Sequence, residues 1–315
     1  MMTRNPQTGS EFSLAVLLDD ICDHVRPAFG RGKVADYIPE LARVNPRKFG
    51  MAVATVDSEI IGAGDCDEPF SLQSITKLFA LILVLNRGGD EIWTRVGKEP
   101  SGTAFNHLAL LEAERGAPRN PFVNAGALAV TDYLMARTKD VAGLMAGFIR
   151  VAGGVDSGGV NEVVAASEIA TAFQNRAIAN ILKAHDTIDH APDAVVDAYC
   201  RQCALEFSVR DLARAALPLA LQGFSPLAGE TMMAPRLVRR VNAVLMTSGM
   251  YESTGSFAYR VGLPAKSGVG GGIVAVAPGR GVVAVWSPEL DRVGNSLVGT
   301  IALELFAQNS GWSIL

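Results

Sequence analysis

The chain has 315 residues, of which 49% are apolar and 19% are charged, and its formal net charge is -4. That length and composition suffice for a sizeable core, in one large domain or in two lobes that share it. The acidic balance and the scattered basic residues argue against nucleic acid or an anionic membrane as the partner. A small molecule is therefore the expected ligand class.

The N-terminal part of the chain predicts a helix followed by two strands. Residues 11–27 carry apolar side chains at helical spacing, and the β-type runs 51–56 and 60–63 are joined by a polar turn at Asp57-Ser58. The apolar run 78–85 predicts a buried helix. Ser71 is the candidate N-cap of that helix, which would place Ser74 in its first turn.

The middle of the chain predicts helices, and the C-terminal part predicts strands again. No proline lies between Pro121 and Pro192, and glycine pairs at 153–154 and 158–159 predict turns. Residues 270–288 predict a β-hairpin that turns at 278–281, and about 296–309 predict a final amphipathic helix. The simplest fold that accounts for this order of elements is α/β (α+β), in one domain over residues 1–315. Residues of about 1–73 and 230–315 would form an α/β lobe, and about 74–229 would form an all-helical lobe inserted into it.

The apolar segments are too short for a membrane span, which needs about 18 consecutive apolar residues. The first residues lack the basic and then apolar order of an export leader. Four cysteines are too few for a disulfide scaffold: Cys22, Cys66, Cys200 and Cys203. These features predict a cytoplasmic protein that has neither nucleic acid nor a membrane as its partner.

Ser74 and Lys77 have a spacing that suits nucleophilic catalysis. A serine hydroxyl attacks well only when a neighbouring base takes its proton, and residues three apart share one face of a helix. The free N–H groups and the dipole of a first helical turn would favour a developing oxyanion, and burial would lower the pKa of the Lys77 amine. About one S-x-x-K is expected by chance in a chain of this length, so the pair could equally be the polar entrance of a buried helix.

Lys266-Ser267-Gly268, just ahead of the predicted hairpin, is a second signal. In penicillin-recognising serine enzymes a K-[ST]-G element accompanies S-x-x-K. Lys266 and Ser267 on a strand edge can bind a substrate carboxylate or support the base. The order is wrong for a phosphate-binding loop, in which lysine follows the glycines. The two elements together favour a serine hydrolase.

The third element of those enzymes, S-D-N or a related triplet, is absent, which argues against a β-lactamase or a peptidase. A phenol can carry protons in its place, and Tyr199 and Tyr251 are the candidates. Cys200 and Cys203 could form half of a metal site. No second pair follows at ligand spacing, so no metal is expected.

Four stretches resemble, in order and spacing, the serine-dependent, β-lactamase-like glutaminases, which hydrolyse L-glutamine to L-glutamate and ammonia. They are ADYIPELA (35–42), FSLQSITKLF (70–79), NPFVNAGALAV (120–130) and SGMYESTGSFAYRVGLPAKSGVGGGI (248–273). The resemblance runs from about residue 25 to 310. It implies the fold of the penicillin-recognising serine enzymes, an antiparallel sheet flanked by helices plus a helical lobe.

The resemblance also implies roles for individual residues. Ser74 matches the nucleophile and Lys77 its base, and the N–H groups of Ser74 and Val269 match the oxyanion hole. Tyr199 or Tyr251 would assist the proton transfer, and no cofactor is implied. The residues implied to line the glutamine site are Tyr37, Ser74, Asn124, Glu168, Asn175, Tyr199, Tyr251 and Val269. Within this set, Glu168 can bind the α-ammonium, and Tyr37, Asn124 and Asn175 can donate to the α-carboxylate.

The chain departs from the family pattern at three positions: Gln174 stands where arginine is usual, Glu252 where aspartate is common, and Ser248 where cysteine is common. The first departure affects the role of the neighbouring Asn175. The family commonly forms oligomers, which predicts a homodimer or homotetramer. Two alternatives to a glutaminase stay open: a serine hydrolase of another amide or of a β-lactam, and a non-catalytic glutamine sensor on the same fold.

Overall fold

The computed structural model describes residues 13–102, 104 and 106–315. Within these residues, five strands form an antiparallel sheet in the order β2-β1-β10-β9-β8. The strands are β1 (Gly50–Thr55), β2 (Ile60–Gly64), β8 (Ala265–Ser267), β9 (Gly272–Ala277) and β10 (Gly281–Trp286). The predicted N-terminal strands and the predicted C-terminal hairpin are confirmed. They meet where β1 pairs with β10, with Gly50 opposite Trp286 and Thr55 opposite Gly281.

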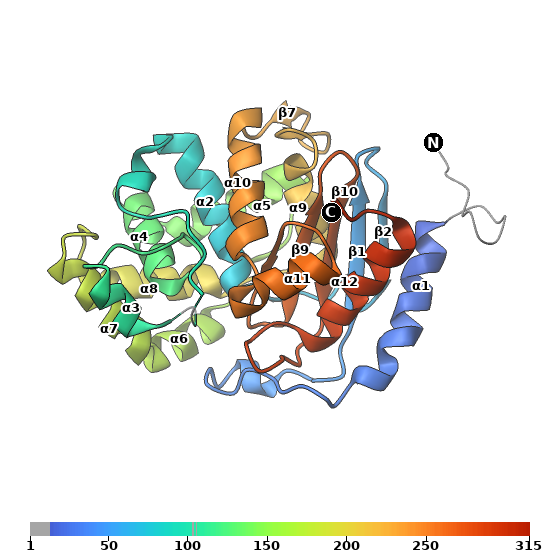
Figure 1. The fold of residues 1–315 in the computed structure, drawn as a ribbon, viewed down its shortest axis with the longest axis horizontal. Coiled ribbons are helices and arrows are strands. Elements are labelled where there is room, and N and C mark those ends of the chain that lie inside the picture. Colours follow the sequence, from blue (N-terminus) through green and yellow to red (C-terminus); the bar gives the residue numbers. More distant parts are fainter. Residues whose placement is uncertain (1–12, 103, 105) are drawn as a thin grey trace.

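Helices cover both faces of this sheet, which explains why β1, β9 and β10 are buried along their whole length. On one face, Met51 and Val53 pack in an apolar cluster with side chains of α1 (Leu14–Val25), α11 (Thr254–Arg260) and α12 (Leu297–Ser310) (Figure 1). On the other face, Ala52 and Ala54 belong to a second cluster, which includes α9 (Val209–Ala216). The alternation along β1 is the two-residue period of a strand.

The second cluster continues into the helices of the middle of the chain (Figure 1). These are α2 (Thr76–Gly88), α3 (Leu108–Ala113), α4 (Asn124–Met135), α5 (Val141–Gly153), α6 (Glu162–Thr171), α7 (Phe173–Ala184), α8 (Pro192–Cys203) and α10 (Pro235–Ser248). Their ends carry local signals. Asp140 caps α5 through a hydrogen bond from Gly143 N at 2.8 Å, and Gly154 ends it in the left-handed conformation.

The middle of the chain also contains short strands that the sequence did not predict. β3 (Phe70–Ser71), β4 (Gly159–Val160) and β5 (Leu205–Phe207) pair in the order β3-β5-β4, and β6 (Phe224–Ser225) pairs with β7 (Glu230–Thr231). Strands of two or three residues are too short to show a period of two. The region 74–229 is therefore mainly helical but includes β4, β5 and β6.

The predicted N-cap was wrong. Ser71 lies in β3, and its hydroxyl donates to the carbonyl of Cys203 at 3.2 Å. A 3-10 turn, η3 (Gln73–Ile75), separates β3 from α2, because Leu72 N donates to Leu205 O and so keeps the chain in the small sheet. Ser74 lies in this turn and Lys77 in the first turn of α2. No helix in the part of the chain that the structure describes is long and apolar enough to cross a membrane.

Candidate active site

Ser74 is a buried residue on η3, where the C-terminal end of β8 crosses the turn. A Cβ atom on Gly268 would lie 2.3 Å from Leu72 O and 3.2 Å from Ser74 N, and one on Gly270 would lie 2.0 Å from Ser71 O. Only glycine lets the two segments approach so closely. The close approach brings Val269 to the same cavity as Ser74.

Lys77 is fully buried in the first turn of α2. Its Nζ donates to Phe122 O at 3.0 Å and to Asn124 Oδ1 at 2.7 Å. It lies 5.8 Å from the centre of the Tyr199 ring. Burial lowers the pKa of Lys77 to about 8. Two acceptors match the two N–H groups of a neutral amine, whose lone pair can then take a proton.

Tyr251 connects Ser74 to β8. Its hydroxyl is hydrogen-bonded to the Ser74 side chain and donates to Ser267 O at 3.4 Å. Tyr251 has a φ of +51°, a left-handed conformation that is uncommon for an aromatic residue. The amine of Lys266 lies 4.5 Å from the centre of the Tyr251 ring. Lys266 therefore contacts the tyrosine and does not reach the cavity.

Lys266 also fastens β8 to the end of α10. Its Nζ donates to Gly249 O at 3.1 Å and to Ser267 O at 2.6 Å. Burial, with a further contribution from the charge of Lys77, shifts the pKa of Lys266 well below its ordinary value. Lys266 and Ser267 are fully buried. One of the two roles expected of them, direct contact with a substrate carboxylate, does not fit this burial.

Glu168 on α6 is a buried carboxylate that faces the same cavity. Gln73 Nε2 donates to Glu168 Oε2 at 3.0 Å and to Ser71 Oγ at 3.0 Å. Burial raises the pKa of Glu168 to about 7, against the opposing effects of the Gln73 hydrogen bond and the charge of Lys77. A ligand cation placed here would favour the ionised carboxylate.

Asn124 and Asn175, at the N-terminal ends of α4 and α7, are joined across the cavity wall. Asn124 Nδ2 donates to Asn175 Oδ1 at 2.9 Å, while Asn124 Oδ1 accepts from Lys77. Tyr199 on α8 is buried beside them, and its hydroxyl is hydrogen-bonded to Cys203. Burial raises the pKa of Tyr199 well above its ordinary value.

The cavity has a volume of about 420 Å³ and brings together most of the predicted residues. Seven of them line it: Tyr37, Ser74, Asn124, Glu168, Asn175, Tyr199 and Val269. Tyr251 lines a second cavity of about 370 Å³ instead. Tyr37 is 56% exposed and lies at the cavity mouth, on the segment whose Ile38 packs near Val164 and Val269.

Sequence reasoning gave no place in the site to seven further residues that line the cavity: Ile38, Gln73, Asn106, Thr171, Ala172, Phe173 and Gln174. Gln73 has a φ of +50°, and nothing in the residue pattern distinguishes it from any polar neighbour of Ser74. Gln174, at the position where arginine is usual, accepts from Asn106 Nδ2 at 2.9 Å and donates to Asn106 O at 3.0 Å. Gln174 therefore links α7 to the segment that precedes α3 through two hydrogen bonds.

Comparison with known proteins decides the family. The family model described as Glutaminase matches residues 32–315. A glutaminase of Caulobacter vibrioides (strain NA1000 / CB15N) is 63% identical over 306 residues, which cover 96% of this chain and 99% of that protein. The chain belongs to the glutaminase family.

Solved structures of glutaminases share the fold. The probable glutaminase ybaS is 35% identical and superposes with a TM-score of 0.89, covering 96% of this chain and 99% of its own. The Bacillus subtilis glutaminase YbgJ is 32% identical with a TM-score of 0.86 and covers 96% of this chain and 100% of its own. That glutaminase was solved as a covalent complex with 5-oxo-L-norleucine, formed by reaction with 6-diazo-5-oxo-L-norleucine. The β-lactamase-like fold is confirmed.

Proposed function

We propose that this glutaminase hydrolyses the side-chain amide of L-glutamine through a covalent ester on Ser74. The observation that carries the proposal is the arrangement around one cavity: a buried serine hydrogen-bonded to Tyr251, a nearby amine with a lowered pKa, and a buried carboxylate. The covalent complex of the Bacillus subtilis relative with a glutamine analogue supports it.

The proton of Ser74 passes to Lys77, with Tyr251 as the carrier. Ser74 is hydrogen-bonded to Tyr251, whose own hydroxyl donates to Ser267 O, so Tyr251 is placed to accept from Ser74. The Tyr199 hydroxyl is engaged with Cys203, which makes Tyr199 a wall of the site rather than the carrier. As the Ser74 oxygen bonds to the amide carbon, Lys77 becomes an ammonium, and it later returns the proton to the departing ammonia.

The backbone N–H groups of Ser74 and Val269 hold the oxyanion, since both residues line the cavity beside the crossing of η3 and β8. Removal of one such donor typically costs about 2.7–4 kcal/mol of transition-state stabilisation. Water then attacks the γ-glutamyl ester, Lys77 takes its proton and gives it to the Ser74 oxygen as the ester bond breaks, and glutamate leaves. Glu168 binds the α-ammonium, and Tyr37, Asn124 and Asn175 bind the α-carboxylate.

Replacing Ser74 with alanine tests the covalent route. Ser74→Ala should abolish ammonia release from glutamine, because Ser74 supplies the attacking oxygen, and the circular dichroism of the variant should match the wild type. A glutamine analogue with an electrophilic side chain should add its mass to the peptide that contains Ser74. Substantial residual turnover, or a label on another residue, would contradict the proposal.

The two alternatives have their own readouts. Glutamine, asparagine and a chromogenic cephalosporin assayed side by side separate a glutaminase from a hydrolase of another amide or of a β-lactam. A protein that binds glutamine without producing ammonia would be a sensor. The intact pair Ser74 and Lys77 favours the enzyme, because a binding protein has no need of an activated serine.

We also propose a cytoplasmic location and a homodimeric or homotetrameric assembly. All four cysteines lie within the described residues and have free thiols, which is typical of a reducing compartment. The assembly rests on the family resemblance. Sedimentation of the purified protein would measure the mass of the particle directly.

A further inference from the structure

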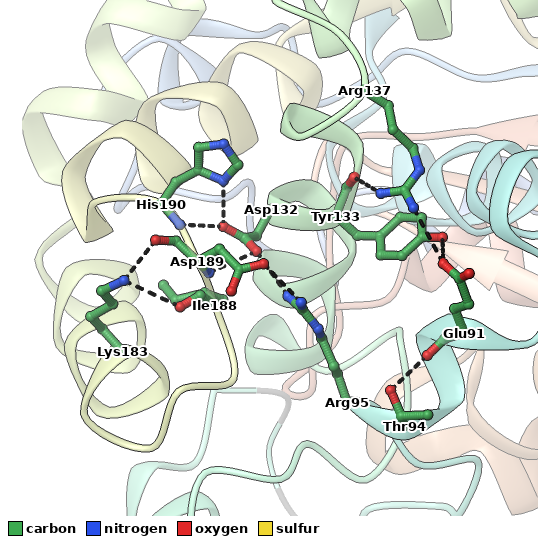
Figure 2. Close-up of polar contacts among 10 residues, drawn as sticks. All are labelled: Glu91, Thr94, Arg95, Asp132, Tyr133, Arg137, Lys183, Ile188, Asp189 and His190. Carbon is green, nitrogen blue, oxygen red and sulfur yellow. Dashed lines mark hydrogen bonds and ion pairs between the residues drawn. The ribbon is translucent and has the colours of Figure 1, made fainter.

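Asp132 is a fully buried carboxylate on α4, outside the cavity, and it accepts four hydrogen bonds (Figure 2). Its Oδ1 accepts from the backbone N and the ring Nδ1 of His190, both at 2.8 Å. Its Oδ2 accepts from Asp189 N at 3.0 Å and from an Arg95 guanidinium nitrogen at 3.3 Å. A buried carboxylate is tolerated only with such partners.

These contacts fasten the connection between α7 and α8 to α4. Asp189 and His190 both lie in that connection, and Arg95 binds Asp189 Oδ2 at 2.7 Å as well as Asp132. Lys183, in the last turn of α7, donates to Asp189 O at 2.6 Å. Figure 2 shows Arg95, Asp189 and His190 around Asp132, with Lys183 bonded to the connection beside them. The connection is thus held by its backbone as well as by its side chains.

The same helices carry the glutamine site at their other ends. α4 begins at Asn124 and α7 begins two residues before Asn175, while α8 returns towards the cavity and carries Tyr199. Asn124 and Asn175 are hydrogen-bonded at 2.9 Å. Asp132 lies about 12 Å further along α4, at a rise of about 1.5 Å per residue. Besides their apolar packing, the α7–α8 pair is therefore joined to α4 by hydrogen bonds at the asparagine pair in the site, between Gln202 and Thr131, and at Asp132, which is remote from the site.

We propose that Asp132 is a positioning residue for glutamine binding, because it fixes the α7–α8 pair that places Asn175 and Tyr199 against Asn124. The proposal rests on the proposed function. It separates binding from chemistry: among the described residues, the hydrogen bonds that Asp132 accepts come from Arg95, Asp189 and His190, and none comes from Ser74, Lys77 or Tyr251. Loss of the anchor loosens the carboxylate-binding wall and leaves the nucleophile in place.

The test is the steady-state kinetics of Asp132→Asn. This variant keeps the volume of the side chain but presents an amide NH₂ to N–H donors. We expect KM for glutamine to rise about fivefold or more, with kcat within about twofold of the wild type. The matched control is Leu303→Ala on α12, a fully buried residue on the far face of the sheet. It should lower the melting temperature with KM unchanged.

His190→Ala is the second variant, and it decides the matter where Asp132→Asn does not fold. It removes the ring hydrogen bond but keeps both backbone bonds to Asp132, so KM should rise about twofold with kcat unchanged. A KM equal to that of Leu303→Ala in both variants would overturn the proposal. So would a fall in kcat with no change in KM.

A double mutant tests whether Asp132 acts through Asn175. Asn175→Ala alone already removes the contact that Asp132 is proposed to position. The KM of the double mutant should therefore exceed the wild-type KM by less than the product of the two single fold-changes. Fully multiplicative effects would overturn this route. A wild-type protein that releases no ammonia from glutamine would instead refute the proposed function, which keeps the two failures apart.

Discussion

Lys77 and Glu168 are buried groups whose charged forms are both disfavoured by loss of water. Burial lowers the pKa of Lys77 to about 8 and raises the pKa of Glu168 to about 7. The amine can therefore act as a base near neutral pH, where an ordinary lysine would be protonated. In the proposed site, the α-ammonium of the substrate would favour the ionised carboxylate.

The two groups predict opposite effects on two kinetic constants. Above about pH 8 Lys77 is neutral, so kcat should rise as pH increases through that value. Below about pH 7 Glu168 is protonated and cannot balance the α-ammonium, so KM should fall as pH increases through that value. Initial rates of ammonia release across this range measure both.

Glu168→Gln is the control for the pH profile. It should raise KM at every pH and remove the dependence of KM on pH, because the amide does not ionise. The rise of kcat with pH should remain but move to lower pH, because the charge of Glu168 raises the pKa of Lys77. A flat kcat in the wild type would contradict the role of Lys77 as base. An unchanged KM in Glu168→Gln would remove the ammonium-binding role.

Single residues were predictable where their chemistry is distinctive. Ser74 with Lys77, and Lys266 with Ser267, have reactive side chains at a spacing that suggests a task. The residue type and spacing of Gln73 suggest no function, because its role depends on a left-handed backbone conformation that turns its amide towards Glu168. The Asp132 anchor was equally hidden, since two of its four donors are backbone groups and all four lie far from it in the sequence.

At the scale of elements, the crossing of η3 with the end of β8 sets the distance between the N–H groups of Ser74 and Val269, the proposed oxyanion donors. A side chain at Gly268 would push these segments apart, because its Cβ would lie 2.3 Å from Leu72 O. Gly268→Ala should therefore lower kcat/KM by about 10²-fold or more, as the loss of one oxyanion donor does. Ammonia release by purified variants measures this.

Gly147→Ala is the matched glycine substitution. A Cβ at Gly147, inside α5, meets no atom within 4 Å. Activity should stay at the wild-type level, and the free energy of unfolding should rise by about 0.5–1 kcal/mol through better helix propensity. A wild-type kcat/KM in Gly268→Ala would show that the crossing does not position the donors.

Long elements were easier to predict than short ones. The runs at 51–56 and 270–288 show strand patterns, and 296–309 shows a helical period, because each packs one or both faces on a core. β3 and η3 have no period of their own. Their form is determined by the pairing of β3 with β5, which lies far away in the sequence. The error at Ser71 follows from this.

In the whole molecule, the sheet separates two apolar clusters. Phe306 on α12 is fully buried in one of them and packs edge-on against Trp312, with ring centres 5.3 Å apart. Phe306→Ala should lower the free energy of unfolding by about 3–5 kcal/mol through the cavity that it leaves. Its kcat/KM should match the wild type at temperatures where it is folded, because Ser74 lies across the sheet. Urea unfolding together with ammonia release checks both, and a lost kcat/KM in folded protein would contradict it.

The pairing of β1 with β10 has a consequence for how the protein is made. Residues 56–280 separate the two strands, so a ribosome releases β1 and β2 long before their partner exists. At roughly 5–20 residues per second, this delay is on the order of tens of seconds. Throughout that time the nascent chain displays the apolar side chains of β1, among them Met51 and Val53, to the cytosol or to a chaperone. The sheet can close only when β9 and β10 have left the exit tunnel.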